Sequence, residues 1–250
     1  AGLRLGMVDD EAARVFGRNM AILAGDIVHG WSVHVLGQAT HDGIPAEIVN
    51  ALLARLTGWV TPELISGEAL DVEYVHRESV TVDEIENMLL MKTGVLLQFA
   101  AEAGVMVGKG TPDWGDADVR QASRFAARAG MAFQLQDDIL GMFGSEERLG
   151  KPICSDLRER KQTVLLVKTL EAATPAERAT LQSLVGKQEL SEEEAATARR
   201  VITDSGALQW TCDRAASLVG DAEKCLAAFP HGPHRQLLKA WLDFLIDRQH

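Results

Sequence analysis

Residues Phe133 to Thr163, FQLQDDILGMFGSEERLGKPICSDLRERKQT, contain the pattern around which the rest of the chain is organised. The stretch opens as an apolar helical pattern in which Gln134, Asp137 and Asp138 stand at positions i, i+3 and i+4. Their side chains therefore project from one face of a helix. Two carboxylates on an otherwise apolar face are costly to bury unless a cation or hydrogen-bond donors satisfy them. The pattern predicts a helix that presents charge to a bound partner.

The segment that follows this helix supplies positive charge. Lys151 and Lys161 lie in this segment, with the acid Asp156 between them. Carboxylates and lysines in one short segment suggest an anion that a hard metal ion bridges to the protein. Mg²⁺ prefers one or two carboxylates, several waters and the oxygens of a phosphate-type ligand, which matches this set.

The order FQLQDDIL, then GK, D and K-x-T resembles the second aspartate-rich region of the trans-isoprenyl diphosphate synthases, the polyprenyl synthetase family. In that family two aspartate-rich motifs face each other across a helical cavity and hold Mg²⁺ ions that bind the diphosphate of an allylic substrate. The resemblance implies that Asp137 and Asp138 bind Mg²⁺. It also implies that Gln134, Lys151 and Lys161 bind substrate, with Asp137 and Lys151 taking part in catalysis.

One position of this motif departs from the family pattern. The usual form is DDxxD, whereas Gly141 occupies the fifth position here, so one carboxylate is missing.

The segment Lys92-Thr93-Gly94 carries a second family feature. Lys92 lies in MKTGVLL, between apolar turns of an expected helix. A lone lysine in mid-helix usually extends its ammonium group to water. In the family, however, a K-T-G segment at this distance before the aspartates binds the allylic diphosphate through its lysine. The resemblance thus implies that Lys92 and Thr93 bind substrate and that Lys92 is catalytic.

The N-terminal region resembles the family only in part. AILAGD, residues 21–26, resembles the helix just after the first aspartate-rich motif, so Asp9 and Asp10 are candidates for the start of that motif and for Mg²⁺ ligands. The family's arginine-rich loop should lie between the two segments. Either that loop is not represented in this sequence, or it is deleted and the two acids merely end a helix.

A further segment, SGEALD at residues 66–71, resembles the family's G-Q-x-x-D segment, with Glu68 in place of glutamine. Asp71 is therefore a candidate for the cavity wall. For Glu68, an exposed position on an amphipathic helix is at least as good an interpretation.

Helical patterns account for the rest of the chain. Capping boxes at Thr81, Thr174 and Ser191 predict helix starts, Pro62 predicts a kink or an interruption, and no stretch shows the alternation of a strand. We expect one all-α domain over residues 1–250, a bundle of about ten helices around a central cavity.

Composition narrows the classes of function. The net charge of −11 lacks the basic footprint of a nucleic-acid-binding protein. Three cysteines without metal-site spacing are expected to be free thiols, which fits a reducing cytoplasm. We find no apolar run of transmembrane length and no signal peptide, and therefore expect neither.

The function implied by the resemblance is a Mg²⁺-dependent prenyltransferase. It would condense an allylic diphosphate with isopentenyl diphosphate to give a longer trans-prenyl diphosphate, and it would act as a homodimer. Two alternatives remain open: a terpene cyclase that ionises a diphosphate, and a non-catalytic subunit that pairs with an active synthase.

Overall fold

The computed structural model describes residues 10–144, 154–187 and 189–246. These residues form helices and connecting turns, with no strand in any of the three ranges. The helical segments, in chain order, are α1 (Asp10–Gln38), α2 (Ala46–Arg55), η2 (Leu56–Val60), α3 (Thr61–Tyr74), α4 (Val82–Leu89), η3 (Leu90–Gly94), α5 (Val95–Lys109), α6 (Ala117–Phe143), α8 (Ser155–Arg158), α9 (Val164–Ala172), α10 (Pro175–Leu184), α11 (Glu192–Asp204), α12 (Ala207–Leu226) and α13 (Pro233–Ile246).

Two π-helical turns join neighbouring segments into longer helices. The turn η2 leads from α2 directly into α3, so the interruption predicted at Pro62 is a π-helical turn that ends at Val60, just before the first turn of α3, which contains Pro62. The turn η3 joins α4 to α5 in the same way and contains Lys92. With these segments joined, the described residues form about ten helices, which confirms the predicted all-α class.

The predicted helix starts are confirmed by side-chain caps. Thr81, Thr174 and Ser191 each accept a hydrogen bond from the backbone N–H three residues later and complete a capping box with a glutamate. Asp116 caps α6 by accepting from the N–H groups of Asp118 and Val119. Each cap satisfies backbone donors that the first turn of a helix leaves without partners.

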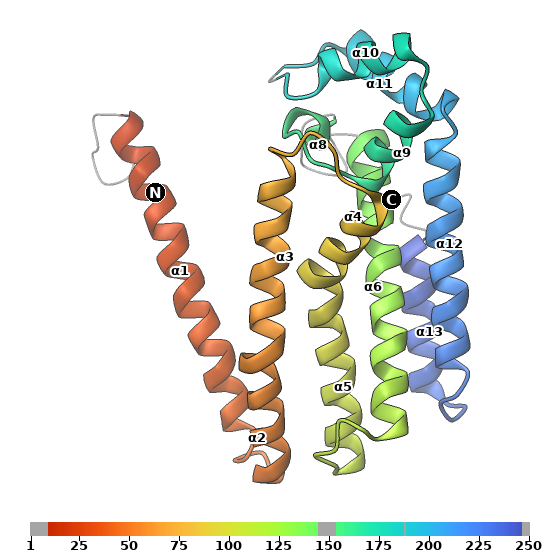
Figure 1. Ribbon diagram of the computed structural model, residues 1–250. Coiled ribbons are helices and arrows are strands. Elements are labelled where there is room, and N and C mark those ends of the chain that lie inside the picture. The colour runs from red at the N-terminus through yellow and green to blue at the C-terminus, as the bar shows by residue number, and fades with distance from the viewer. Residues whose placement is uncertain (1–9, 145–153, 188, 247–250) are drawn as a thin grey trace.

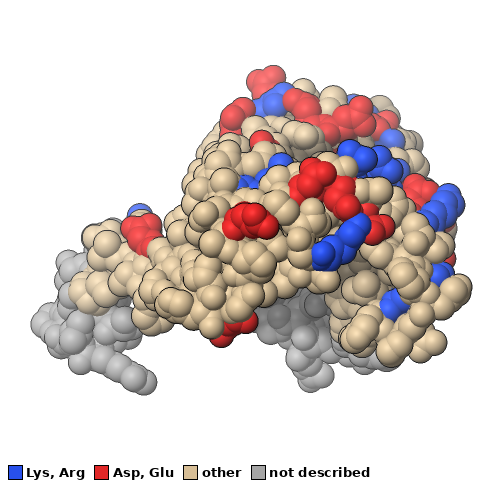
Figure 2. All heavy atoms as spheres, turned by 90° about the horizontal axis from the view of Figure 1, so that it is seen from below, with Lys and Arg blue, Asp and Glu red and all other residues tan. Residues whose placement is uncertain are grey.

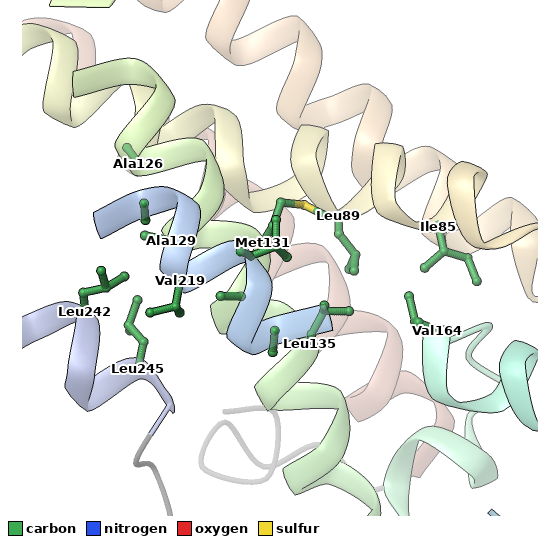
Figure 3. Packing of buried hydrophobic residues seen from close by; sticks show 14 of the residues in the cluster. Ile85, Leu89, Ala126, Ala129, Met131, Leu135, Val164, Val219, Leu242 and Leu245 are labelled. Atoms are coloured by element: carbon green, nitrogen blue, oxygen red, sulfur yellow. The ribbon is translucent and has the colours of Figure 1, made fainter. Parts of the chain in front are cut away.

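The long helix α6 connects three hydrophobic clusters. Its residue Val119 belongs to a cluster with α2 and α5, Leu135 to a cluster with α4, α12 and α13, and Met142 to a cluster with α9 to α11. Figure 3 shows part of the second cluster, with Leu89 of α4 and Val219 of α12 close to the side chains of α6. Because one helix contributes to all three clusters, the packing supports a single domain.

The first helix differs from the others in its surroundings. It contacts α2 at its C-terminal end and stands apart from α3 to α6 along most of its length (Figure 1). The described part of this helix runs from Asp10 without a break to Gln38, so the alternative in which the two acids end a helix is wrong for Asp10.

Apolar side chains on α1 are exposed to solvent. Ile27, Val28, Trp31 and Val35 are 61–67% exposed and share one side of the helix, because they stand at i, i+1, i+4 and i+8. In Figure 2 the arm that α1 forms at the left shows few charged groups. We call these four residues the α1 face.

By length and composition alone, two helical stretches reach the dimensions of a membrane span, Arg14–Gln38 and Val82–Lys109. This corrects the expectation that no apolar run is long enough to span a membrane. The second stretch combines α4, η3 and α5, which pack against α6, and core helices commonly pass the same test.

Candidate active site

A cavity of about 370 Å³ lies between α3, α4, α6 and α8, toward the end of the bundle where Figure 1 shows α8. Its wall combines ionisable and amide side chains with a small apolar part. The lining residues are Asp71, Ile85, Met88, Leu89, Lys92, Gln134, Asp137, Asp138, Gly141, Ser155, Asp156, Lys161, Gln162 and Thr163.

Lys92 enters this cavity from the π-helical turn η3. Its Nζ lies 2.7 Å from Asp71 Oδ2 and 3.0 Å from Glu68 Oε2, and its side chain is 28% exposed. Burial acts to lower the pKa of Lys92, but its hydrogen bonds to Asp71 and Glu68 outweigh that effect and raise the pKa above its ordinary value. The ammonium group is therefore charged and points into the cavity wall.

Close contact between α3 and η3 places Lys92 beside these acids. A Cβ atom at Gly67 would lie 2.4 Å from the backbone nitrogen of Lys92, so only glycine allows the two helices to approach this closely. Glu68 was interpreted either as a counterpart of the family's glutamine or as an exposed acid. Its side chain is exposed, and it also forms an ion pair with Lys92.

The face of α6 predicted from the sequence is on the cavity wall. Gln134, Asp137 and Asp138 all line it. Asp138 is partly exposed as a residue, but its Oδ2 is buried and has no hydrogen-bond partner. Burial, followed by the negative charges of Asp156 and Asp137, raises the pKa of Asp138 well above its usual value.

These residues fit a bound Mg²⁺ ion. A buried carboxylate oxygen without a partner is costly, and a divalent cation would remove that cost together with the repulsion among the acids. Within the described ranges, no group of three or more Asp, Glu, His or Cys side chains is close enough to hold a metal by itself. Mg²⁺ needs no such group, because it takes one or two carboxylates and completes its shell with water and phosphate oxygens.

A further part of the cavity wall comes from α8 and the residues after it. Lys161 Nζ lies 3.5 Å from Asp156 Oδ1 and 3.3 Å from Glu159 Oε2. Burial acts to lower the pKa of Lys161, and the charges of Asp156 and Glu159 outweigh it, so the pKa is raised. Lys161 is a second cationic group beside the carboxylates of α6.

The structure brings together six of the residues predicted from the sequence for the site or the cavity wall, namely Asp71, Lys92, Gln134, Asp137, Asp138 and Lys161. Thr93, which follows Lys92 in η3, is not among the residues that line the cavity. Its role in substrate binding stays a prediction.

Three predicted residues cannot be placed. Lys151 and Asp9 lie outside the described residues, and so does the side chain of Asp10. Their predicted roles stay untested.

Sequence reasoning left out one acid that lines the cavity. Asp156 was noted only as an acid between two lysines, and it lies in α8, a helix of four residues that is too short to show a periodic pattern. The one signal that could have identified Asp156 is its place in the family pattern, in which an aspartate follows the GK pair and precedes K-x-T.

Comparison with known proteins gives the same family. The model of the family described as polyprenyl synthetase matches residues 9–202. A geranylgeranyl diphosphate synthase of Saccharolobus solfataricus is 36% identical over 204 residues, which cover 80% of this chain and 58% of that protein. A short chain isoprenyl diphosphate synthase of Methanothermobacter thermautotrophicus is 31% identical over 98% of this chain and 74% of its own length.

A solved structure has a matching fold. The geranylgeranyl pyrophosphate synthase of Corynebacterium glutamicum, complexed with isoprenyl diphosphate and magnesium, superposes with a TM-score of 0.83 at 25% identity. The match covers 98% of this chain and 67% of that one. The chain thus spans between 58% and 74% of the lengths of these relatives. From its matching segments and its helical architecture, the chain belongs to the polyprenyl synthetase family.

Proposed function

We propose that the protein is a prenyltransferase that condenses an allylic diphosphate with isopentenyl diphosphate to give a longer trans-prenyl diphosphate. One observation carries this proposal: a single cavity combines the α6 carboxylates with the charged groups of Lys92 and Lys161. The two curated relatives are named as synthases of such products, which supports the same reaction here.

Lys92 and Lys161 suit the first half of this reaction. A diphosphate that leaves an allylic carbon takes the bonding electron pair with it, so negative charge grows on its oxygens. Two fixed ammonium groups in a partly buried site stabilise that charge more strongly than they would in water. Lys92 would exchange its bonds to Asp71 and Glu68 for bonds to the diphosphate.

Mg²⁺ would be held by Asp137 and Asp138, where it would neutralise charge on the diphosphate and orient the leaving group. The magnesium named for the Corynebacterium structure supports this choice of ion. In this chain the buried Oδ2 of Asp138 provides a reason for binding a cation.

The second half of the reaction requires walls that do not react with a carbocation. Ile85, Met88 and Leu89 of α4 form an apolar part of the cavity wall. Aliphatic side chains offer no nucleophilic oxygen or nitrogen and they keep water away from the reacting carbon. The double bond of isopentenyl diphosphate is then the available nucleophile, and loss of a proton completes the longer chain.

We also propose that the protein is a homodimer that works in a reducing cytoplasm. The α1 face supports the first point, since contiguous exposed apolar side chains mark interaction surfaces. The free thiols of Cys154, Cys212 and Cys225 support the second.

The direct test is incorporation of labelled isopentenyl diphosphate into an extended prenyl diphosphate, with an allylic co-substrate and Mg²⁺. A terpene cyclase would instead consume the allylic diphosphate alone and release a hydrocarbon. A non-catalytic subunit would give neither product. Either of those results would overturn the proposed function.

A further inference from the structure

Two acids on α3 share the ammonium group of Lys92, and they differ in their surroundings. Glu68 and Asp71 stand at i and i+3, so both project from one side of the helix. Lys92 Nζ lies 3.0 Å from Glu68 Oε2 and 2.7 Å from Asp71 Oδ2. Asp71 lines the cavity and its side chain is 17% exposed, whereas Glu68 is not among the lining residues and its side chain is 60% exposed. The bond to Glu68 thus holds the ammonium group to a side chain outside the cavity.

The backbone keeps Glu68 and Lys92 close together. A Cβ atom at Gly67, the residue before Glu68, would lie 2.4 Å from the backbone nitrogen of Lys92 and 2.8 Å from its Cα. The helix α3 and the turn η3 therefore touch at the point from which the two side chains extend. Because the backbones are already in contact, formation of this ion pair requires ordering of the two side chains only.

A diphosphate that binds Lys92 must compete with these acids. The ammonium group has three N–H donors, and the hydrogen bonds to Asp71 and Glu68 use two of them. Of the two acids, Glu68 has the longer bond and the more exposed side chain, so it is the weaker partner and the one that an anion displaces. Its displacement subtracts the free energy of the ion pair from that of diphosphate binding.

We propose that Glu68 is a positioning residue that competes with the diphosphate for Lys92 and thereby weakens diphosphate binding. The inference rests on the proposed function, because it concerns a diphosphate in the same cavity. A glutamine, which the G-Q-x-x-D pattern has at this position, could still accept a hydrogen bond from Lys92. It would compete less strongly, because hydrogen bonds between charged groups are about twice as strong as neutral ones.

A merely structural role for the ion pair explains the geometry less well. The close contact at Gly67 and the shorter bond from Lys92 to Asp71 already attach η3 to α3. An ion pair with an exposed partner adds little to stability. The two roles also predict opposite effects, because loss of a structural contact weakens diphosphate binding and loss of a competitor strengthens it.

The test is calorimetric titration of the full chain with inorganic diphosphate in the presence of Mg²⁺, without turnover. Glu68→Gln keeps the size of the side chain and removes its charge. Glu73→Gln is the matched control, because Glu73 is an exposed acid of the same helix and is not one of the two acids bonded to Lys92. Lys92→Gln and the double variant Glu68→Gln with Lys92→Gln complete a cycle that measures the coupling of the two residues.

We expect Glu68→Gln to bind diphosphate about threefold to fivefold more tightly than the parent, and Glu73→Gln to bind within about 1.5-fold of it. When Lys92→Gln is already present, adding Glu68→Gln should change the affinity by no more than about 1.5-fold, because there is no ammonium group to compete for. Titration at about 0.15 M salt keeps the direct repulsion between the exposed Glu68 and the diphosphate small.

The inference is overturned if Glu68→Gln improves diphosphate binding by less than about twofold, if Glu73→Gln gains as much, or if the gain is the same when Lys92 is replaced. A parent chain that does not bind diphosphate with Mg²⁺ would overturn the proposed function as well. A parent that binds diphosphate but is unaffected by Glu68→Gln would overturn the inference alone, which distinguishes the two failures.

Discussion

The cavity wall and the α1 face are both built from long, largely apolar helices, yet they present opposite kinds of surface. In the cavity, carboxylates and ammonium groups are partly withdrawn from water beside Ile85, Met88 and Leu89. On α1, the apolar side chains of Ile27, Val28, Trp31 and Val35 are in contact with solvent. The first region buries charge, and the second exposes apolar groups.

Each arrangement is unfavourable by itself. Burial of a charge costs free energy that only a partner of opposite charge recovers, and exposed apolar area costs free energy that burial recovers. The difference indicates which partner each region requires. The cavity fits a metal ion and a diphosphate, and the α1 face fits another apolar surface, which we propose is a second copy of the chain.

The largest effect is expected from removing the α6 carboxylates. Asp137→Ala, alone or combined with Asp138→Ala, should lower Mg²⁺-dependent turnover by about a thousandfold or more, because the metal then loses its ligands. The melting temperature without metal should hold or rise, since repulsion among the acids is relieved. A product assay at saturating Mg²⁺ measures the first effect, and near-normal turnover would contradict the metal assignment.

The next effect concerns the α1 face. Trp31→Glu combined with Val35→Glu should weaken dimer formation by about a hundredfold, since charges placed in an apolar interface must be desolvated. Light scattering at micromolar concentration should give twice the 27.1 kDa chain mass for the parent and a single chain mass for the variant.

A matched change elsewhere provides the control for that experiment. Leu237→Glu alters a side chain that is 69% exposed on α13, on the other side of the bundle from α1 (Figure 1). It should leave the dimer intact. A parent that is monomeric at micromolar concentration would show that the α1 face is covered by something other than a second copy.

A smaller effect is expected at Lys92. Lys92→Gln keeps most of the side-chain length and removes the charge, so binding of an allylic diphosphate analogue with Mg²⁺ should weaken by about tenfold to a hundredfold. Lys109→Gln is the matched control, because Lys109 also bonds two acids, Asp116 and Asp118, but lies outside the cavity. Equal affinity of Lys92→Gln and the parent would show that Lys92 has a structural role only.

The smallest effect is on stability, and it depends on pH. Burial raises the pKa of Asp138, so the folded protein keeps a proton that the unfolded chain releases above about pH 3.9. Stability therefore falls as pH rises from that value through the raised pKa. Without metal, Asp138→Asn should gain about 1–3 kcal/mol over the parent at about pH 7.5 and less at about pH 4.5.

Thermal unfolding at both pH values measures this difference. A stability gain that is the same at both would show that Asp138 does not change its proton occupancy in that range.

The sequence predicted the α6 side of the site because a helix has a fixed period. Spacing alone placed Gln134, Asp137 and Asp138 on one face, and the capping boxes at Thr81, Thr174 and Ser191 gave the helix starts. These features depend on neighbours within four residues, and the structure confirms them.

Features that depend on distant contacts were not predictable. The approach of Asp156 to Gly141 requires the turn at Cys154 and its bond to Met142, and the pairing of Lys92 with Asp71 requires the close packing at Gly67. The position of α1, which contacts α2 and stands apart from α3 to α6, likewise depends on contacts between distant segments. No local pattern contains that information.

The measurement that tests the central claim most directly is calorimetric binding of inorganic diphosphate to the parent chain, with and without Mg²⁺. If the α6 carboxylates and the two cavity lysines form one metal–diphosphate site, diphosphate should bind with Mg²⁺ and bind at least about tenfold more weakly without it. The Mg²⁺-dependent part should disappear in Asp137→Ala. Equal binding with and without Mg²⁺, or no binding in either case, would contradict the assignment of the cavity as the active site.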